Sequence, residues 1–431
     1  MDTPTAKDVG ALIRGARCAR RLTQAQVGAA CGYSASAVSR IESGRLHLDY
    51  TRFMQFAAFL EINPDRLAPA PVPTGVLVAT VKDQADEEDA VRRRELLTGA
   101  LAAGATAALG TSTASAASAP ANPAAGLEEV LFRLPSAAPV PLRRLTQETV
   151  RARSAFRATQ YTMLGRSLPA LLAAASATRD AATGHERETT NVALARCYVL
   201  AAELALKQHD DTAWVAADRA LAAARASGHP VPIGEASRVL AITMRRSGRC
   251  PAAVRFLTDE ARDLDAGEAR TGAVRTTLML TAAYTAANGG DRTAAMDLLD
   301  AADEEIDRWR AATPSGLFTV DATRAQADVY RLGVHNALGT PDEGVAIAAG
   351  LDIDRLPTAE RRARAWTDTA RMWHALGEDR RTFSALRNVE QEAPQEVRRP
   401  ALRALTSDLL YSSARVQGVR EFAARTGALS A

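Results

Sequence analysis

Residues 22–44 read LTQAQVGAACGYSASAVSRIESG and contain two short helical patterns separated by a tight turn. Thr23 is of a type that caps helix N-termini, so a helix is expected over 24–31. Ser34 can cap a second helix, which is expected over 35–43. Two short helices joined by a turn of three or four residues form a helix-turn-helix unit. The stretch therefore predicts a small helical domain.

Further helical patterns flank this unit on both sides. Apolar residues recur at spacings of three and four over 9–16, which places them on one face of a helix. Gly32, in the turn, suits the left-handed conformation with which many helices end. Another helix is expected over 50–60, and Asn63 can cap a short last one. The N-terminal domain, residues 1–67, is thus expected to contain five helices.

With these spacings, residues 1–67 resemble the DNA-binding domains of the Cro and phage-repressor type, the Xre family. The matching residues are Ile13-Arg14, Arg17, Leu22-Thr23-Gln24, Val27, Gly32-Tyr33-Ser34 and Val38-Ser39-Arg40-Ile41-Glu42-Ser43-Gly44. In that family the third helix lies in the major groove of double-stranded DNA, and a dimer reads two half-sites. The resemblance therefore implies a DNA-binding domain.

The resemblance also assigns roles to individual positions. The residues implied to pack the two helices together are Val27, Cys31, Val38 and Ile41. The residues implied to contact bases are Ala35, Ser36, Ser39 and Arg40. Contacts with DNA phosphates are implied for Gln24 and Arg45.

Two positions depart from the family pattern. Gly28 stands where alanine is usual, which loosens its helix by up to ~1 kcal/mol. Ala35 and Ser36 stand where phage repressors often carry amide side chains, so base reading is expected to depend mainly on Arg40, which can pair with guanine. Sequence preference is then modest. A helical protein-interaction domain that uses the same fold is the alternative.

Composition favours an all-α chain of more than one unit. The 431 residues exceed one ordinary core, and only 5% are aromatic whereas much of the 47% hydrophobic share is alanine. The net charge of +3 equals the surplus of nine Lys and Arg over six Asp and Glu in residues 1–67. The rest of the chain is neutral, so no strong general attraction to nucleic acid or membrane is expected.

Residues 68–139 are expected to form a linker. They begin with the Pro-rich stretch 68–73, and no charged residue occurs over 96–127, which is rich in Ala, Gly, Ser and Thr. Arg92-Arg93-Arg94-Glu95-Leu96-Leu97, before this Ala-rich run, resembles a twin-arginine export signal. Its position after a complete domain, and an apolar part shorter than the ~20 residues needed to span a bilayer, favour the linker instead.

Residues 140–431 show helical patterns interrupted at regular intervals. The expected breaks are at Gly165, 209–211, Gly248, 289–291, 339–341 and 377–379. Helix-pair repeats have such intervals, because one hairpin cannot bury its apolar face alone and stacks on the next. The region resembles degenerate tetratricopeptide repeats, which implies an α-solenoid.

Arginines recur seven positions apart within this region. The pairs are Arg238 and Arg245, Arg324 and Arg331, and Arg364 and Arg371. Seven residues are nearly two helical turns, so each pair shares a face. If these faces line the concave side, they can hold an acidic peptide or an anionic ligand; a solvated stripe is the alternative.

No sequence pattern indicates an enzyme, a cofactor or a metal site. The chain contains no phosphate-binding loop of the GxxxxGK type, no HExxH and no GxSxG, and its six histidines are scattered. Cys18, Cys31, Cys197 and Cys250 lack CxxC spacing and are expected to be reduced thiols of a cytoplasmic protein.

Together these patterns predict a transcriptional regulator. It is expected to bind double-stranded DNA through residues 1–67 and to use residues 140–431 for homodimerisation and for sensing a peptide, another ligand or a protein, with no membrane contact. The alternative is a helical-repeat scaffold whose N-terminal domain only localises it. DNA-binding preference separates the two.

Overall fold

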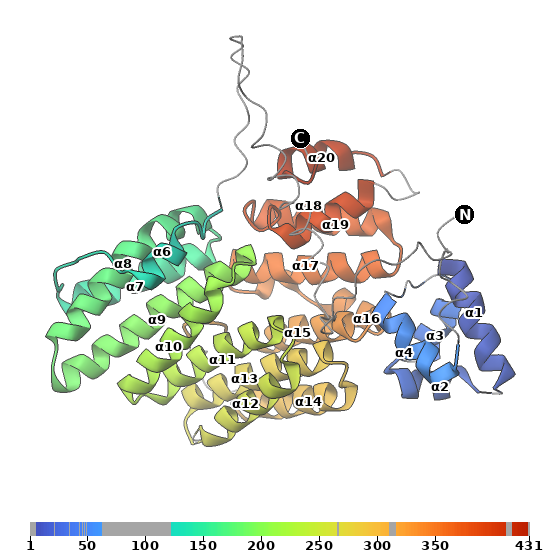
Figure 1. The fold of residues 1–431 in the computed structure, drawn as a ribbon, viewed down its shortest axis with the longest axis horizontal. Helices are drawn as coiled ribbons and strands as arrows, with labels where there is room; N and C mark the ends of the chain where they lie inside the picture. The colour runs from blue at the N-terminus through green and yellow to red at the C-terminus, as the bar shows by residue number, and fades with distance from the viewer. Residues whose placement is uncertain are drawn as a thin grey trace, which may run out of the picture.

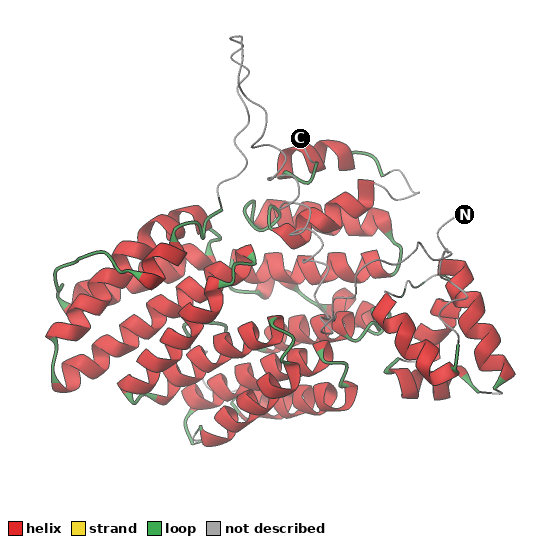
Figure 2. Cartoon of the chain, viewed as in Figure 1, coloured by secondary structure: helices red, strands yellow, loops and turns green. Residues whose placement is uncertain are grey.

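The fold comes from a computed structural model, which describes residues 6–20, 22–33, 35–42, 44, 46, 48, 50–62, 122–264, 267–309, 316–410 and 416–429. In these residues the chain forms nineteen α-helices and no strand (Figure 2). The all-α prediction is confirmed. No helix of this part combines the length and apolar character needed to cross a bilayer. The stretch 92–97 lies outside the described residues.

The N-terminal domain contains four described helices. They are α1 (Ala6–Ala19), α2 (Gln24–Cys31), α3 (Ala35–Glu42) and α4 (Tyr50–Leu60). Thr23 caps α2 as predicted: its side chain accepts the Gln26 N–H, and the Gln26 side chain accepts the Thr23 N–H at 2.8 Å. Gly32 ends α2 with a φ of 75°. The fifth predicted helix, after Asn63, falls outside the described residues.

One apolar core joins these four helices. Val27, Val38 and Ile41, which were expected to pack α2 against α3, are at most 1% exposed, and Cys31 lies half-buried beside them. At Gly10 α1 closely approaches α3, since a Cβ there would lie 2.2 Å from the Ile41 carbonyl oxygen. The core therefore fixes the position of α3.

The second part of the chain is a series of helical hairpins (Figure 1). The paired helices are α7 (Leu142–Arg157) with α8 (Tyr161–Ala181), α9 (Gly184–Gln208) with α10 (Thr212–Ser227), α11 (Pro230–Arg246) with α12 (Cys250–Asp263), α13 (Ala269–Asn288) with α14 (Arg292–Arg308), α15 (Arg324–Ala337) with α16 (Gly344–Gly350), α17 (Ala359–Ala375) with α18 (Asp379–Glu392), and α19 (Pro400–Leu410) with α20 (Val419–Thr426). A short 3-10 turn, η2 (Ile353–Arg355), precedes α17.

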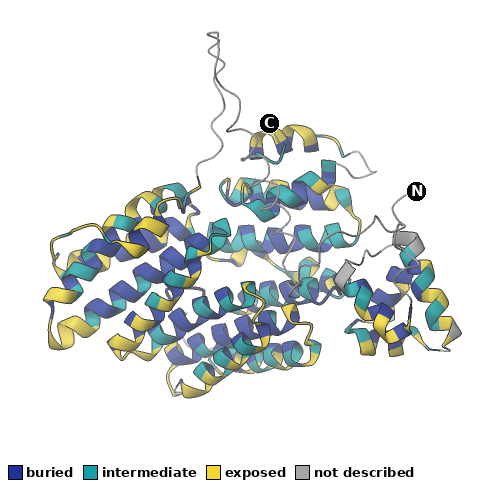
Figure 3. Ribbon diagram, viewed as in Figure 1, coloured by how far each residue is buried: buried dark blue, intermediate teal, exposed yellow. Residues whose placement is uncertain are grey.

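The first helices of six hairpins pack side by side. We call α7, α9, α11, α13, α15 and α17 the inner helices. Each contacts the next, and α17 also contacts α7, which closes the series. Figure 3 shows α9 and α13 buried along most of their length, whereas the outer helices keep exposed faces. The hairpins thus surround a shared interior.

Two expectations about this region differ from the structure. Residues 122–139, assigned to the linker, are folded: α6 (Leu127–Phe132) packs on α8 and α10 with Leu127 and Leu131 1% exposed. The break expected at Gly165 is wrong, because Gly165 lies inside α8. A Cβ on Gly165 would lie 1.9 Å from the Pro123 carbonyl oxygen. This glycine therefore permits close packing of 122–139 rather than ending a helix.

Candidate nucleic-acid interface and interior ion-pair network

A hydrogen-bonded network fixes α3 relative to α1 and α2. Arg17 of α1 donates to Glu42 Oε2 at 2.9 Å and to the Leu22 carbonyl oxygen at 2.9 Å. Gln24 of α2 donates its amide hydrogen to the same Glu42 oxygen at 2.8 Å. Burial would raise the pKa of Glu42, but the bonds from Arg17 and Gln24 outweigh it and lower that pKa. Glu42 is therefore a charged anchor at the end of α3.

Sequence reasoning did not assign Glu42 this role. Arg17 and Glu42 both stand in the motif that carries the family resemblance, and Glu42 immediately follows the inward-facing Ile41. The Gln24 contact with phosphate stays a prediction, and in this structure its amide group positions Glu42.

The outward face of α3 carries Ser39 and Arg40. Ser39 is exposed, and the Arg40 side chain is 31% exposed, while Val38 and Ile41 on either side of this pair are buried. This is the alternation expected for a helix that packs on one side and reads DNA with the other. The side chains of Ala35 and Ser36, and all of Arg45, lie outside the described residues. All the base and phosphate contacts stay predictions.

The same face of the N-terminal domain contacts the hairpins. Arg40 Nη2 lies 2.7 Å from Asp342 Oδ2, and Arg52 of α4 donates to the Ala337 carbonyl oxygen at 2.5 Å. Figure 1 shows α3 and α4 beside α16. We call residues 337–342, which run from the last residue of α15 toward α16, the docking turn. It brings an acidic side chain to the arginine that was expected to contact bases.

The docking turn fits closely under the N-terminal domain. Gly339 has a φ of 69°, and a Cβ there would lie 2.9 Å from Tyr33 Oη and 2.4 Å from Arg52 Nη1. The Asp342 side chain is only 5% exposed. In the docked arrangement Asp342 therefore engages part of the Arg40 guanidinium that was expected to contact bases.

Comparison with known families agrees with this geometry. Residues 8–70 match the family model described as "Helix-turn-helix domain". The N-terminal part is a helix-turn-helix domain. No curated protein and no solved structure matches the chain. The helix-turn-helix domain supports a DNA-binding regulator. The tetratricopeptide likeness of the hairpins stays a prediction.

Ion pairs fill part of the interior between the inner helices. Lys207, at the end of α9, places Nζ 2.5 Å from Glu360 Oε1 of α17 and 2.5 Å from Glu396 Oε1. Burial would raise the pKa of Glu396, but Lys207 and Arg399 outweigh it and lower that pKa to about 2. This network ties helices together that are far apart in the sequence.

The three arginine pairs do not share one surface. Arg324 and Arg331 of α15 both bind Asp303 of α14, at 2.6 and 2.8 Å, so that pair faces the second helix of the preceding hairpin. The other two pairs approach the interior around two tyrosines, Tyr284 and Tyr330. Within the described residues no group of His, Cys, Asp or Glu side chains is arranged to hold a metal ion.

Proposed function

We propose that this chain is a transcriptional regulator that binds double-stranded DNA through α3 and whose hairpins pair two copies and sense a ligand. The observation that carries the proposal is α3, which buries Val38 and Ile41 and turns Ser39 and Arg40 outward within a helix-turn-helix domain. The resemblance to the Xre family and to tetratricopeptide repeats supports the finer assignment. The proposal includes a cytoplasmic location and no catalytic step.

Docking supplies a way to regulate DNA binding. Asp342 and a DNA base compete for Arg40, and the docking turn occupies the face that DNA would approach. A regulator in this arrangement binds DNA only after the helix-turn-helix domain leaves the docking turn. DNA and docking are therefore mutually exclusive states of one chain, and any ligand that favours one of them controls binding.

DNA binding is expected to reside in the helix-turn-helix domain and to be salt-sensitive. Genomic fragments retained by the full chain should share a sequence, and each neutralised phosphate should contribute about −0.9 to the slope of log K against log salt. Residues 122–431, which keep their own core, should retain no such fragments. If residues 122–431 bound the selected fragments as tightly as the full chain, this assignment would be wrong.

The docked face also favours a second candidate function. In the docked state the domain contacts the chain's own hairpins rather than DNA, as a protein-interaction domain would. The protein is then a scaffold whose hairpins bind another protein. The same selection separates the two functions, since a scaffold enriches no common sequence from genomic DNA.

The hairpin region is expected to dimerise the regulator. A single recognition helix seldom reaches specific affinity, so two helix-turn-helix domains must be brought to two half-sites about one turn of DNA apart. Residues 122–431 should sediment as a dimer at micromolar concentration, whereas residues 1–67 should sediment as a monomer. A monomeric 122–431 fragment would refute the dimerisation role. It would not bear on DNA binding by the helix-turn-helix domain, which the genomic selection tests.

A further inference from the structure

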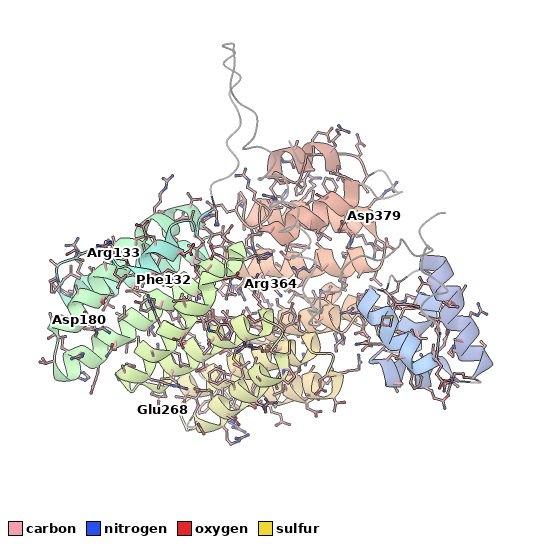
Figure 4. The ribbon with its side chains drawn as sticks, viewed as in Figure 1. Phe132, Arg133, Asp180, Glu268, Arg364 and Asp379 are labelled. Atoms are coloured by element: carbon pink, nitrogen blue, oxygen red, sulfur yellow. The ribbon has the colours of Figure 1, made fainter. Side chains whose placement is uncertain are left out.

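Two arginines from different inner helices share one half-buried tyrosine ring. The Arg245 guanidinium of α11 lies 4.6 Å from the centre of the Tyr284 ring of α13, and that of Arg364 of α17 lies 5.6 Å from it. Figure 4 places Arg364 in the middle of the hairpin array. The Arg364 charge is close enough to disfavour the charged form of Arg245, so this arrangement needs a reason.

Arg245 has no acidic partner of its own. Its guanidinium donates to the Thr285 hydroxyl at 3.3 Å, and no carboxylate of the described residues forms an ion pair with it. Arg364 and Arg371 share a single carboxylate, Asp368, at 2.8 and 3.9 Å. Within the part of the chain that the structure describes, the only ion-pair partner of these three guanidinium groups is therefore the one carboxylate of Asp368.

In this cluster of Arg245, Arg364, Arg371, Tyr284 and Asp368, the arginines are more accessible to solvent than the carboxylate. The Asp368 side chain is 2% exposed, whereas those of Arg364 and Arg371 are 27% and 37% exposed. Arg245 and Tyr284 are half-buried. A solute that reaches this surface meets guanidinium groups and a phenol, with the carboxylate behind them.

The arrangement is unfavourable without a counter-ion. Burial and the nearby Arg364 charge lower the pKa of Arg245. Burial would raise the pKa of Tyr284, but Arg364, Arg371 and Arg245 outweigh it and lower that pKa. A partly buried charge that lacks a partner destabilises a fold, and such groups are often retained for function.

We propose that Arg245, Arg364, Arg371 and Tyr284 bind a compact polyanion that carries phosphate groups. Guanidinium groups bind phosphate oxygens with paired, charge-assisted hydrogen bonds, and the tyrosine hydroxyl can donate another. We expect a compact ligand because Arg364 and Arg371 expose 27% and 37% of their side chains and Arg245 is half-buried. This assignment rests on the sensing role proposed above and names its ligand class.

The site is next to the helix that leads to the docking turn. A Cβ on Gly333 of α15 would lie 3.2 Å from the Tyr284 ring, and Asn336 donates to the Asp368 carbonyl oxygen at 2.8 Å. The docking turn begins at the next residue, Ala337. An anion bound at this site therefore lies beside α15, the helix that leads into the docking turn. The docking turn in turn binds Arg52 through Ala337 and Arg40 through Asp342.

Calorimetric titration of the full chain with inorganic pyrophosphate, without DNA, tests the site. Wild type should bind saturably, and Arg245→Gln should weaken binding by about tenfold or more, because it removes one charge-assisted contact. Since Arg245 has no acidic partner, the variant should unfold at the same temperature as wild type or higher. Arg324→Gln removes the same charge from the face that binds Asp303 and should bind pyrophosphate as wild type does.

A spectroscopic titration gives a second readout. Burial would raise the pKa of Tyr330, but Arg238, which donates to its hydroxyl at 2.8 Å, and Arg361 outweigh it and lower that pKa to about 8. A bound anion adds negative charge nearby, so pyrophosphate should raise the pH at which Tyr330 ionises. Absorbance of tyrosinate follows this ionisation, and the step that belongs to Tyr330 is the one that is missing in Tyr330→Phe.

Three results would overturn the proposal. They are wild-type affinity in Arg245→Gln, no saturable binding of pyrophosphate to wild type, and tighter binding of a hexaglutamate peptide than of pyrophosphate. The last result would assign the site to an acidic peptide. Because no arm contains DNA, failure here leaves the DNA-binding proposal untouched, and failure of the genomic selection leaves the anion site untouched.

Discussion

Replacing Lys207 by methionine should lower the free energy of unfolding of the hairpin region by about 3–5 kcal/mol. The substitution removes the cation that lies 2.5 Å from both Glu360 and Glu396, whose side chains are 4% and 2% exposed. Methionine keeps much of the side-chain volume, so loss of charge rather than a cavity causes the effect. Urea denaturation followed by circular dichroism measures it.

An exposed ion pair provides the control for Lys207→Met. Arg262 pairs with Asp259 at 2.9 Å with side chains 73% and 62% exposed, so Arg262→Met should change stability by less than about 1 kcal/mol. In Lys207→Met, a further Glu396→Gln substitution should restore part of the loss, because it removes a buried charge that, among the described residues, has only Arg399 left as a cationic partner. Equal effects of Lys207→Met and Arg262→Met would contradict the network's role.

The pH dependence of unfolding tests the same network. The pKa of Glu396 falls from an ordinary 4.5 to about 2 on folding, so its stabilising contribution is complete above pH 4.5. That contribution is lost as the pH falls from about 4.5 to 2. Wild-type stability should decline over this window, and the decline should be shallower in Lys207→Met, where the folded-state pKa of Glu396 is less depressed.

Replacing Arg40 by alanine removes a base contact with an expected contribution of about 1–3 kcal/mol and should relax the preference at one base pair, while loss of its pair with Asp342 offsets part of the fall in affinity. Arg40 projects from α3 beside the buried Val38 and Ile41. Gln24→Ala, at a predicted phosphate contact, should instead weaken binding to all sequences similarly. Fluorescence anisotropy with a set of single-base operator variants measures both profiles.

Asp342→Asn should act in the opposite direction to Arg40→Ala. It weakens the ion pair that holds α3 on the docking turn, so DNA affinity should rise. Asp259→Asn changes the charge equally at an exposed pair with Arg262 and should leave affinity unchanged. The base-reading assignment fails if Arg40→Ala and Gln24→Ala change affinity in the same way across the operator variants. The docking assignment fails if Asp342→Asn and Asp259→Asn have the same DNA affinity.

Local chemistry explains why the helix-turn-helix domain was predictable from sequence. Thr23, Gly32 and the spacing of Val27, Val38 and Ile41 act within a few residues or one helix pair, and the structure confirms each of them. Most hairpin boundaries follow from turn residues of the same local kind, such as Gly248 and Gly377, both with positive φ.

Contacts between distant residues could not be predicted in this way. The Arg40 contact with Asp342 joins residues in different domains, and nothing in either local pattern indicates the partner. Gly165 misled the sequence analysis because a glycine can serve a close approach as well as a turn, and its neighbour Pro123 belongs to a stretch assigned to the linker. The three arginine pairs share one spacing but differ in the helices that face them.

The contact between α17 and α7 affects how this region folds. In an open helical-repeat array each hairpin contacts only its neighbours, so stability is a sum of local terms and single repeats can be added or removed. Here Lys207 of α9 binds Glu360 of α17 across the closure. Early and late hairpins must therefore assemble together, which raises the mean sequence separation of contacts and slows folding relative to an open array. We therefore expect the hairpins from α7 to α18 to unfold in one cooperative transition, and deletion of an internal hairpin to disrupt the closure.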